Sequence, residues 1–329
     1  MKFFENLFKI PDNNYYGVSG LTLELNCIYI YNTFIKQDGS VLVVTNSLYE
    51  ANNFYQRLLN YTDKVLFFPM DDFITSEAIA ISPEFKVERI NTLNKLVNNG
   101  NYIVICNLMG VLRYLPTKKT WKDSILNIKK DQDYDREILL NKLYNLGYEN
   151  ETIVTETGKV GVRGYVVDIF PTGEENPIRI EFWGDTIDSI KYFDVETQLT
   201  TKEIKEINIF PYTEFILSEE KDDIERKQKY LQYYSDKISG IWDYVNNNIC
   251  FYYDYGQLVN SYYLLRESIL EYDKENCSSI KTNYMYDIEN VNCNNQIYLM
   301  NLDNLLENLK LHKNYKFLSY NIENFKTSK

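Results

Sequence analysis

Short apolar runs alternate with amphipathic stretches along the first third of the chain. Three runs are long enough for a buried strand and too short for a helix: 41–45, 65–69 and 102–106. Residues 47–60 place apolar side chains at helical spacing behind Asn46 or Ser47, residue types that cap helix starts. Ser82 and Pro83 open a second helix, which ends near Gly100. Strands that alternate with helices indicate a parallel sheet with covering helices.

Residues 159–198 carry the most regular strand pattern in the sequence. Apolar side chains alternate with polar or aromatic ones along one run: Ile178, Ile180 and Phe182 against Arg179, Glu181 and Trp183. This period of two predicts a strand with one core face and one polar face. Gly184-Asp185 fits a two-residue hairpin turn, because glycine adopts positive φ without steric cost, and 185–194 is the return strand. In the earlier run 160–170 we expect a bulge or a close backbone approach at Gly164.

The elements around this sheet indicate a compact α/β module between two other segments. Its helix begins at Asp133 or Asp135 and ends at Gly147. Strands are predicted on either side, at 124–130 and 206–211. Further helices are predicted at 218–238 and 256–275, and further strands at 249–255, 296–302 and 315–320. The predicted segments are 1–121, 122–211 and 212–329, in keeping with the two or three domains expected for 329 residues.

Composition indicates a globular chain that does not bind nucleic acid by itself. The hydrophobic content of 44% is ordinary for a protein with a core. The formal net charge is −12, and no basic run is longer than the lysine pairs at 118–119 and 129–130. Such a chain repels a phosphate backbone, and its field favours a basic partner surface.

The cysteines and the single histidine predict neither a metal site nor a catalytic group. No CxxC pair occurs among Cys27, Cys106, Cys250, Cys277 and Cys293, so we expect buried reduced thiols. His312 alone supplies no triad and no histidine-based metal site. No apolar run approaches the roughly 20 residues of a membrane span, and residues 1–10 lack the features of a signal peptide. We therefore expect a cytoplasmic protein.

An early glycine-containing turn lies where an ATPase would have its phosphate-binding loop. Gly17, Gly20 and Thr22 are present, but Leu21 occupies the position of the lysine that reaches the phosphates. No lysine follows until Lys36. We expect this degenerate loop not to bind nucleotide.

Several long motifs in this sequence resemble one protein family. They are GVRGYVVDIFP, PIRIEFWGDTIDSIKYFDVETQ, INIFPYTEF and FPMDDF followed by SPEFKVERINTL. Together they resemble the N-terminal region of the bacterial transcription-repair coupling factors (Mfd), which is itself similar to the repair helicase subunit UvrB. The DVETQ and SPEFKVERINTL segments and the absent lysine favour Mfd over UvrB, which keeps a working phosphate loop.

The resemblance implies a fold, a partner and a binding site. Residues 1–121 and 212–329 would form one degenerate, split P-loop-NTPase-like parallel-sheet domain, with the UvrB-like α+β antiparallel-sheet domain 122–211 inserted. In the family this inserted domain binds UvrA through two arginines and an aromatic, which fall on Arg163, Arg179 and Trp183. Tryptophan stands where the family more often has phenylalanine. Composition alone favours a plainer interpretation, an Arg179–Glu181 surface ion pair beside a half-buried tryptophan.

In the family this region precedes an RNA-polymerase-interacting domain and an ATP-driven DNA translocase, whose motifs do not occur here. We therefore expect a fragment or a truncated reading frame that is monomeric, non-catalytic and free of cofactors. RNA polymerase, DNA, ATP and Mg²⁺ would be bound by the missing C-terminal parts of the parent. Two alternatives remain at this stage: a UvrB-like nucleotide-dependent helicase component, and a scaffold that docks on the missing translocase part. In the family that part masks the UvrA-binding face, so the fragment by itself should bind UvrA constitutively.

Overall fold

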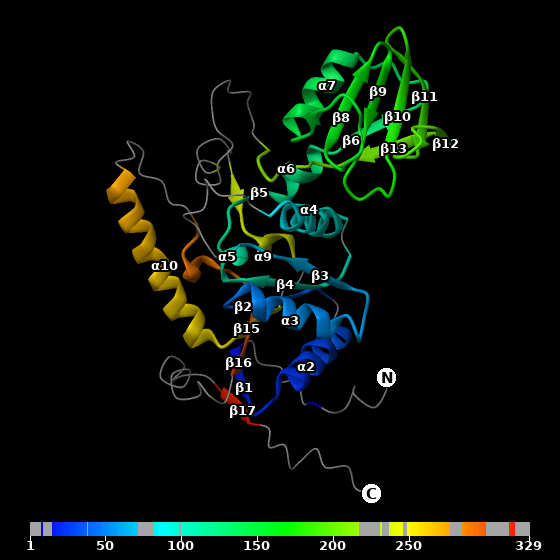
Figure 1. Ribbon diagram of the computed structural model, residues 1–329. Coiled ribbons are helices and arrows are strands. Elements are labelled where there is room, and N and C mark those ends of the chain that lie inside the picture. Colours follow the sequence, from blue (N-terminus) through cyan, green and yellow to red (C-terminus); the bar gives the residue numbers. More distant parts are fainter. Residues whose placement is uncertain are drawn as a thin grey trace, which may run out of the picture. The chain divides into compact units, whose positions relative to one another are not determined.

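The computed structural model divides the chain into two compact units (Figure 1). Unit 1 comprises Met1–Tyr114 and Gly240–Lys329, and unit 2 comprises Leu115–Ser239. Unit 2 therefore extends on both sides beyond the segment 122–211. The structure describes residues 8, 15–37, 39–71, 82–98, 100–216, 231, 237–245, 249–276, 285–300 and 316–319. The helix predicted at 218–238 lies almost entirely outside the described residues, as do Cys277 and His312.

Seven parallel strands form the sheet of unit 1, in the order β17-β1-β16-β15-β2-β4-β3. Their bounds are β1 (Tyr15–Ser19), β2 (Val41–Thr45), β3 (Val65–Phe68), β4 (Ile103–Asn107), β15 (Ile249–Tyr253), β16 (Asn295–Met300) and β17 (Lys316–Ser319). Every strand predicted for this part of the chain is present, which confirms the parallel sheet. Strand β1 and the helix that follows it were not predicted.

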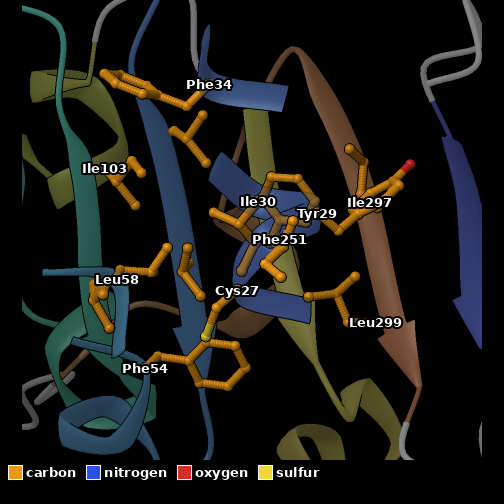
Figure 2. Packing of buried hydrophobic residues seen from close by; sticks show 14 of the residues in the cluster. Cys27, Tyr29, Ile30, Phe34, Phe54, Leu58, Ile103, Phe251, Ile297 and Leu299 are labelled. Carbon is orange, nitrogen blue, oxygen red and sulfur yellow. The ribbon is translucent and has the colours of Figure 1, made fainter. Parts of the chain in front are cut away.

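Helices cover both faces of this sheet (Figure 1). The helices of unit 1 are α2 (Leu23–Lys36), α3 (Leu48–Leu58), α4 (Pro83–Val97), α5 (Leu108–Val111), α9 (Ile241–Tyr244), α10 (Tyr255–Asn276) and the short 3₁₀ helix η3 (Ile288–Asn290). Ser47 caps α3 and accepts a hydrogen bond from the backbone N–H of Glu50. On the face covered by α2 and α3, Tyr29, Phe54 and Phe251 pack in one buried cluster (Figure 2). This cluster is the core of unit 1 on that face.

Unit 2 is built on a six-stranded sheet in the order β12-β11-β10-β9-β8-β7. The strands are β7 (Glu149–Asn150), β8 (Lys159–Arg163), β9 (Val166–Ile169), β10 (Ile178–Trp183), β11 (Thr186–Phe193) and β12 (Thr200–Ile204). All neighbours pair antiparallel except β7 and β8. Two further antiparallel pairs complete the unit, β6 (Leu126–Lys129) with β13 (Glu206–Ile209) and β5 (Leu115–Pro116) with β14 (Ile238–Ser239).

The inner face of the six-stranded sheet is covered by α7 (Arg136–Asn145). Leu139 and Leu143 of this helix are fully buried against Ile180 and other strand residues. Asp135 is the N-cap, since its carboxylate accepts from the backbone N–H of Ile138. The predicted mixed α/β architecture, with one parallel and one antiparallel sheet, is thus confirmed.

The expected bulge or close approach at Gly164 is wrong. Residues 160–170 are not one strand but the hairpin β8–β9, and Gly164-Tyr165 is its two-residue turn. Gly164 has φ +60°, and a Cβ there would meet no atom within 4 Å, so the turn needs the backbone angle rather than the space. The β10–β11 turn matches its prediction, with Gly184 at φ +62°. Both turns therefore lie side by side at one end of the sheet, which we call the tip.

Within the part of the chain that the structure describes, no helix combines the length and apolar character needed to cross a membrane.

The turn geometry generates a stability prediction. Gly184→Ala forces a Cβ into the left-handed region and should destabilise the protein by about 1 kcal/mol. Asp185→Ala changes the neighbouring turn residue, whose φ is not positive, and should shift stability by no more than about 0.5 kcal/mol. Urea unfolding of the two variants measures both values, and equal costs would contradict the assignment of the turn strain to Gly184.

Candidate functional site

The polar residues singled out from the sequence lie on the outer face of the unit 2 sheet, opposite α7. Along β10 the apolar residues are buried, Arg179 and Glu181 are half-buried, and Trp183 is exposed. The cross-strand register places Arg179 directly opposite Asp168 on β9 and opposite Lys191 on β11. Residues paired in this way point to the same face of an antiparallel sheet. The predicted alternation of core and polar positions along β10 is confirmed.

Arg179 is held in place by its neighbours. Its Nε donates to Oδ1 of Asp168 at 2.8 Å and its Nη2 donates to Oδ2 at 2.9 Å, a bidentate ion pair. Nη1 also donates to the carbonyl oxygen of Gln198 at 3.3 Å, and the guanidinium lies 4.7 Å from the ring centroid of Phe193. The exposed fraction is 18% for the Arg179 side chain and 4% for Asp168. This arrangement anchors the turn after β11 to the sheet.

Glu181 does not form the ion pair with Arg179 that the plainer interpretation required, and Trp183 is exposed rather than half-buried. The carboxylate of Glu181 instead accepts from the hydroxyl of Ser189 and from Nζ of Lys191, the latter at 2.6 Å. The hydrogen bond from Lys191, followed by the one from Ser189, lowers the pKa of Glu181 below its ordinary value. Arg179 prefers Asp168 because the two face each other across β9 and β10 and fit a fork-to-fork geometry.

Arg163 and Trp183 are the last residues of two strands that end near the tip. Arg163 is the last residue of β8 and Trp183 the last residue of β10, with only β9 between these strands. Two strand spacings, about 10 Å, separate β8 from β10, and the register places Arg163 level with Glu181, two residues before Trp183. Nη2 of Arg163 donates to the carbonyl oxygen of Thr152 at 3.1 Å, while the Trp183 side chain is 83% exposed. Tryptophan and arginine are residue types enriched at protein–protein hot spots.

Two exposed or half-exposed residues at the tip were missed by sequence reasoning. Tyr165 occupies the β8–β9 turn and is 67% exposed. The guanidinium carbon of Arg136, at the start of α7, lies 5.8 Å from the centroid of its ring. The alternation of apolar and polar residues along the strands could not predict the exposure of Tyr165, because a turn residue belongs to neither face of the sheet. Arg136 could not be predicted either, because it reaches the tip only through the packing of α7.

The degenerate phosphate-loop residues are not gathered in a loop. Gly17 lies inside β1 and pairs with Tyr298 of β16, so only residues 20–22 connect β1 to α2. Gly20 has φ +82°, and Leu21 is buried. Thr22 is the N-cap of α2, and its hydroxyl accepts from the backbone N–H of Leu25 at 3.4 Å.

The cysteines that the structure describes are buried and unbridged. They are Cys27, Cys106, Cys250 and Cys293. Burial raises the pKa of the Cys27 thiol to about 12 and raises the pKa of Cys106 as well. Such thiols are poor nucleophiles. Among the described residues no group of three His, Cys, Asp or Glu side chains has the arrangement of a metal site.

The comparisons with known proteins first define the class of unit 2. Residues 126–215 match the family described as the UvrB interaction domain. This range contains the whole outer face and the tip, including Arg163, Arg179 and Trp183.

Curated relatives then show which kind of protein this chain is similar to. The transcription-repair-coupling factor of Staphylococcus haemolyticus is 32% identical over 221 residues, which are 67% of this chain and 19% of the relative. The factor of Staphylococcus epidermidis is 33% identical over 219 residues, 66% of this chain and 19% of the relative. The factor of Staphylococcus aureus is 34% identical over 205 residues, 62% of this chain and 18% of the relative.

The resemblance to the N-terminal region of the transcription-repair-coupling factors is therefore confirmed. The matched part of the chain spans less than a fifth of the length of these curated relatives.

The ion pair on the outer face generates a second stability prediction. Arg179→Ala leaves the buried carboxylate of Asp168 without its partner and should cost on the order of 3 kcal/mol or more. Arg163→Ala is the matched control, because this exposed arginine donates to the backbone carbonyl of Thr152 rather than to a buried carboxylate, and it should cost no more than about 1 kcal/mol. Urea unfolding compares the two, and similar losses would contradict a special role of the pair.

The lowered pKa of Glu181 generates a pH prediction. A carboxylate whose folded pKa is depressed contributes stability above its unfolded pKa of about 4.3, and this contribution disappears as pH falls through the folded value. Glu181→Gln should therefore be less stable than the unchanged protein at pH 6, and the difference should shrink below about pH 4. Unfolding curves at several pH values check this, with exposed Glu175→Gln as control. A difference that stays constant down to pH 3 would refute it.

Proposed function

We propose that this chain is a non-catalytic binding module of a transcription-repair coupling factor. It recruits the nucleotide-excision-repair protein UvrA to RNA polymerase stalled at DNA damage. The match of residues 126–215 to the UvrB interaction domain is the observation that carries the proposal. The names of the relatives describe a link between transcription and repair and support the same role.

Arg163, Arg179 and Trp183 are proposed to form the UvrA-binding site. Trp183 supplies a large apolar surface that the free protein leaves in water, and burying such a side chain contributes about 1.5–3 kcal/mol. Arg163, on the same outer face of the sheet, supplies a planar cation suited to a carboxylate of the partner. The bidentate pair with Asp168 fixes the sheet on which both are presented. A rigid site loses little conformational entropy on binding.

Unit 1 is proposed to be a degenerate P-loop-NTPase-like domain, split by unit 2, that no longer binds nucleotide. The parallel sheet with helices on both faces supports this ancestry. The connection at residues 20–22 is much shorter than the eight-residue motif that cradles phosphates, and Leu21 replaces its lysine. ATP, Mg²⁺, DNA and RNA polymerase would be bound by other parts of a longer parent protein. A UvrB-like helicase component is disfavoured by the same two features, and a titration that gave micromolar ATP affinity would restore it.

The proposal predicts a measurable interaction. The chain should bind purified UvrA in a calorimetric titration, and Trp183→Ala should weaken binding by about 2 kcal/mol or more, roughly thirtyfold. Trp183→Phe should retain most of the affinity, because the aromatic anchor remains. Tyr49→Ala is the control, since Tyr49 is also highly exposed but lies on α3 of unit 1. Absence of binding by the unchanged chain would overturn the proposed function, and unchanged binding by Trp183→Ala would overturn the site.

A further inference from the structure

Exposed apolar side chains of unit 2 gather at the tip of its sheet. Four of them surround the two hairpin turns or begin the helix beside them: Ile138, Val162, Tyr165 and Trp183. Val162 and Tyr165 belong to the β8–β9 hairpin, and Trp183 ends β10 at the next hairpin. Val162 lies opposite Val167 and so belongs to the α7 side of the sheet, whereas Trp183 belongs to the outer face, so the group spans both faces at the end of the sheet. Exposed apolar side chains gathered on a small domain mark an interaction site more often than scattered ones do.

Backbone and side-chain hydrogen bonds hold the parts of the tip together. The N–H of Phe182 donates to the carbonyl oxygen of Tyr165 at 2.9 Å, which joins the two hairpins. The N–H of Tyr134 donates to the carbonyl oxygen of Asp185 at 2.7 Å, and the hydroxyl of Thr186 donates to Asp133 at 2.6 Å. These bonds tie the segment before α7 to the β10–β11 turn.

Arg136 ties the start of α7 to the other turn. Its Nη1 donates to the carbonyl oxygen of Gly164, and its guanidinium faces the ring of Tyr165. Ile138 follows in the first turn of the helix and is 53% exposed. The tip is therefore a pre-ordered surface in which two aromatic side chains, two aliphatic ones and the cations Arg136 and Arg163 lie at one end of the sheet.

Arg179 differs from these residues in burial and in bonding. Three of its nitrogen atoms already donate to Asp168 or Gln198, and Phe193 lies against the guanidinium. A partner carboxylate would have to compete with a bidentate pair whose acceptor is buried. Such a residue orders the sheet that carries the contact residues more readily than it makes the contact.

We propose that the UvrA-binding surface is centred on the tip, with Tyr165 and Ile138 as additional contact residues and Arg179 as a positioning residue. The inference rests on the proposed function and deepens it. The matching region of UvrA should present an apolar patch that covers Tyr165 and Trp183, with carboxylates that reach Arg163 and Arg136. Arg136 and Arg163 donate to backbone carbonyl oxygens and keep a positive charge that partner carboxylates can meet, whereas the tip carboxylate of Asp133 already accepts from Thr186. Asp185, exposed in the β10–β11 turn, disfavours an acidic group directly above that turn.

The experiment is a calorimetric titration of UvrA with the full chain and single variants. Tyr165→Ala and Ile138→Ala should each weaken binding at least fivefold without a change in the unfolding midpoint. The controls are Tyr49→Ala in unit 1 and Leu199→Ala, which is 68% exposed between β11 and β12, away from the tip. Both controls should leave the dissociation constant within twofold. If the unchanged chain binds and Trp183→Ala weakens binding, but Tyr165→Ala and Ile138→Ala do not, the tip proposal fails and the proposed function stands.

Asp168→Asn separates positioning from direct contact by Arg179. If Arg179 positions the sheet, this variant should weaken UvrA binding about as much as Arg179→Ala and should lower the melting temperature in the same way. If Arg179 contacts UvrA directly, removal of the competing carboxylate should leave binding unchanged or make it tighter. If Asp168→Asn binds UvrA as tightly as the unchanged chain or more tightly, while Arg179→Ala still binds UvrA weakly, the positioning role is overturned.

Discussion

The bidentate pair between Arg179 and Asp168 is the constraint on which the outer face of unit 2 depends. A buried carboxylate is tolerated only with a close cation and satisfied lone pairs, and Arg179 supplies both in one planar group. The same guanidinium reaches the carbonyl of Gln198 and lies against Phe193. One interaction therefore connects β9, β10 and the turn after β11, and the polar face keeps a single arrangement.

Ion pairs continue across the sheet from this point. Lys191 lies opposite Arg179 in the register, but its charge is offset by Glu181, while Lys130 pairs with Glu203 at 2.7 Å. The cations in the middle of the outer face are thus matched by carboxylates of the same unit. Towards the tip, Arg163 and Arg136 donate to backbone carbonyl oxygens. A carbonyl oxygen has no formal charge, so these hydrogen bonds do not neutralise the two guanidinium groups. Burial and pairing decrease from the middle of the sheet to the tip, in parallel with the increasing exposure of aromatic side chains.

Sequence patterns predicted the elements better than the pairing between them. Buried runs such as 41–45 and the alternation along β10 are local signals, so the strands and their faces followed from the residues alone. The partner of Arg179 did not follow, because Glu181 is near in sequence whereas Asp168 is near only once β9 and β10 are in register. The β8–β9 turn was missed for a related reason, since Gly164 fits both a bulge and a hairpin until the hydrogen bonds are known. The roles of Arg163, Arg179 and Trp183 in binding stay predictions.

The short pairing between β5 and β14 bears on how one domain can be inserted into another during evolution. These strands are the first and last residues of unit 2, and Ser239 lies opposite Leu115 in the register. A unit whose two ends are held side by side can be inserted into a host loop without forcing the host apart. Unit 2 therefore has the geometry of an inserted domain. Because its two ends lie side by side, residues 115–239 are a suitable segment to graft into a loop of an unrelated protein.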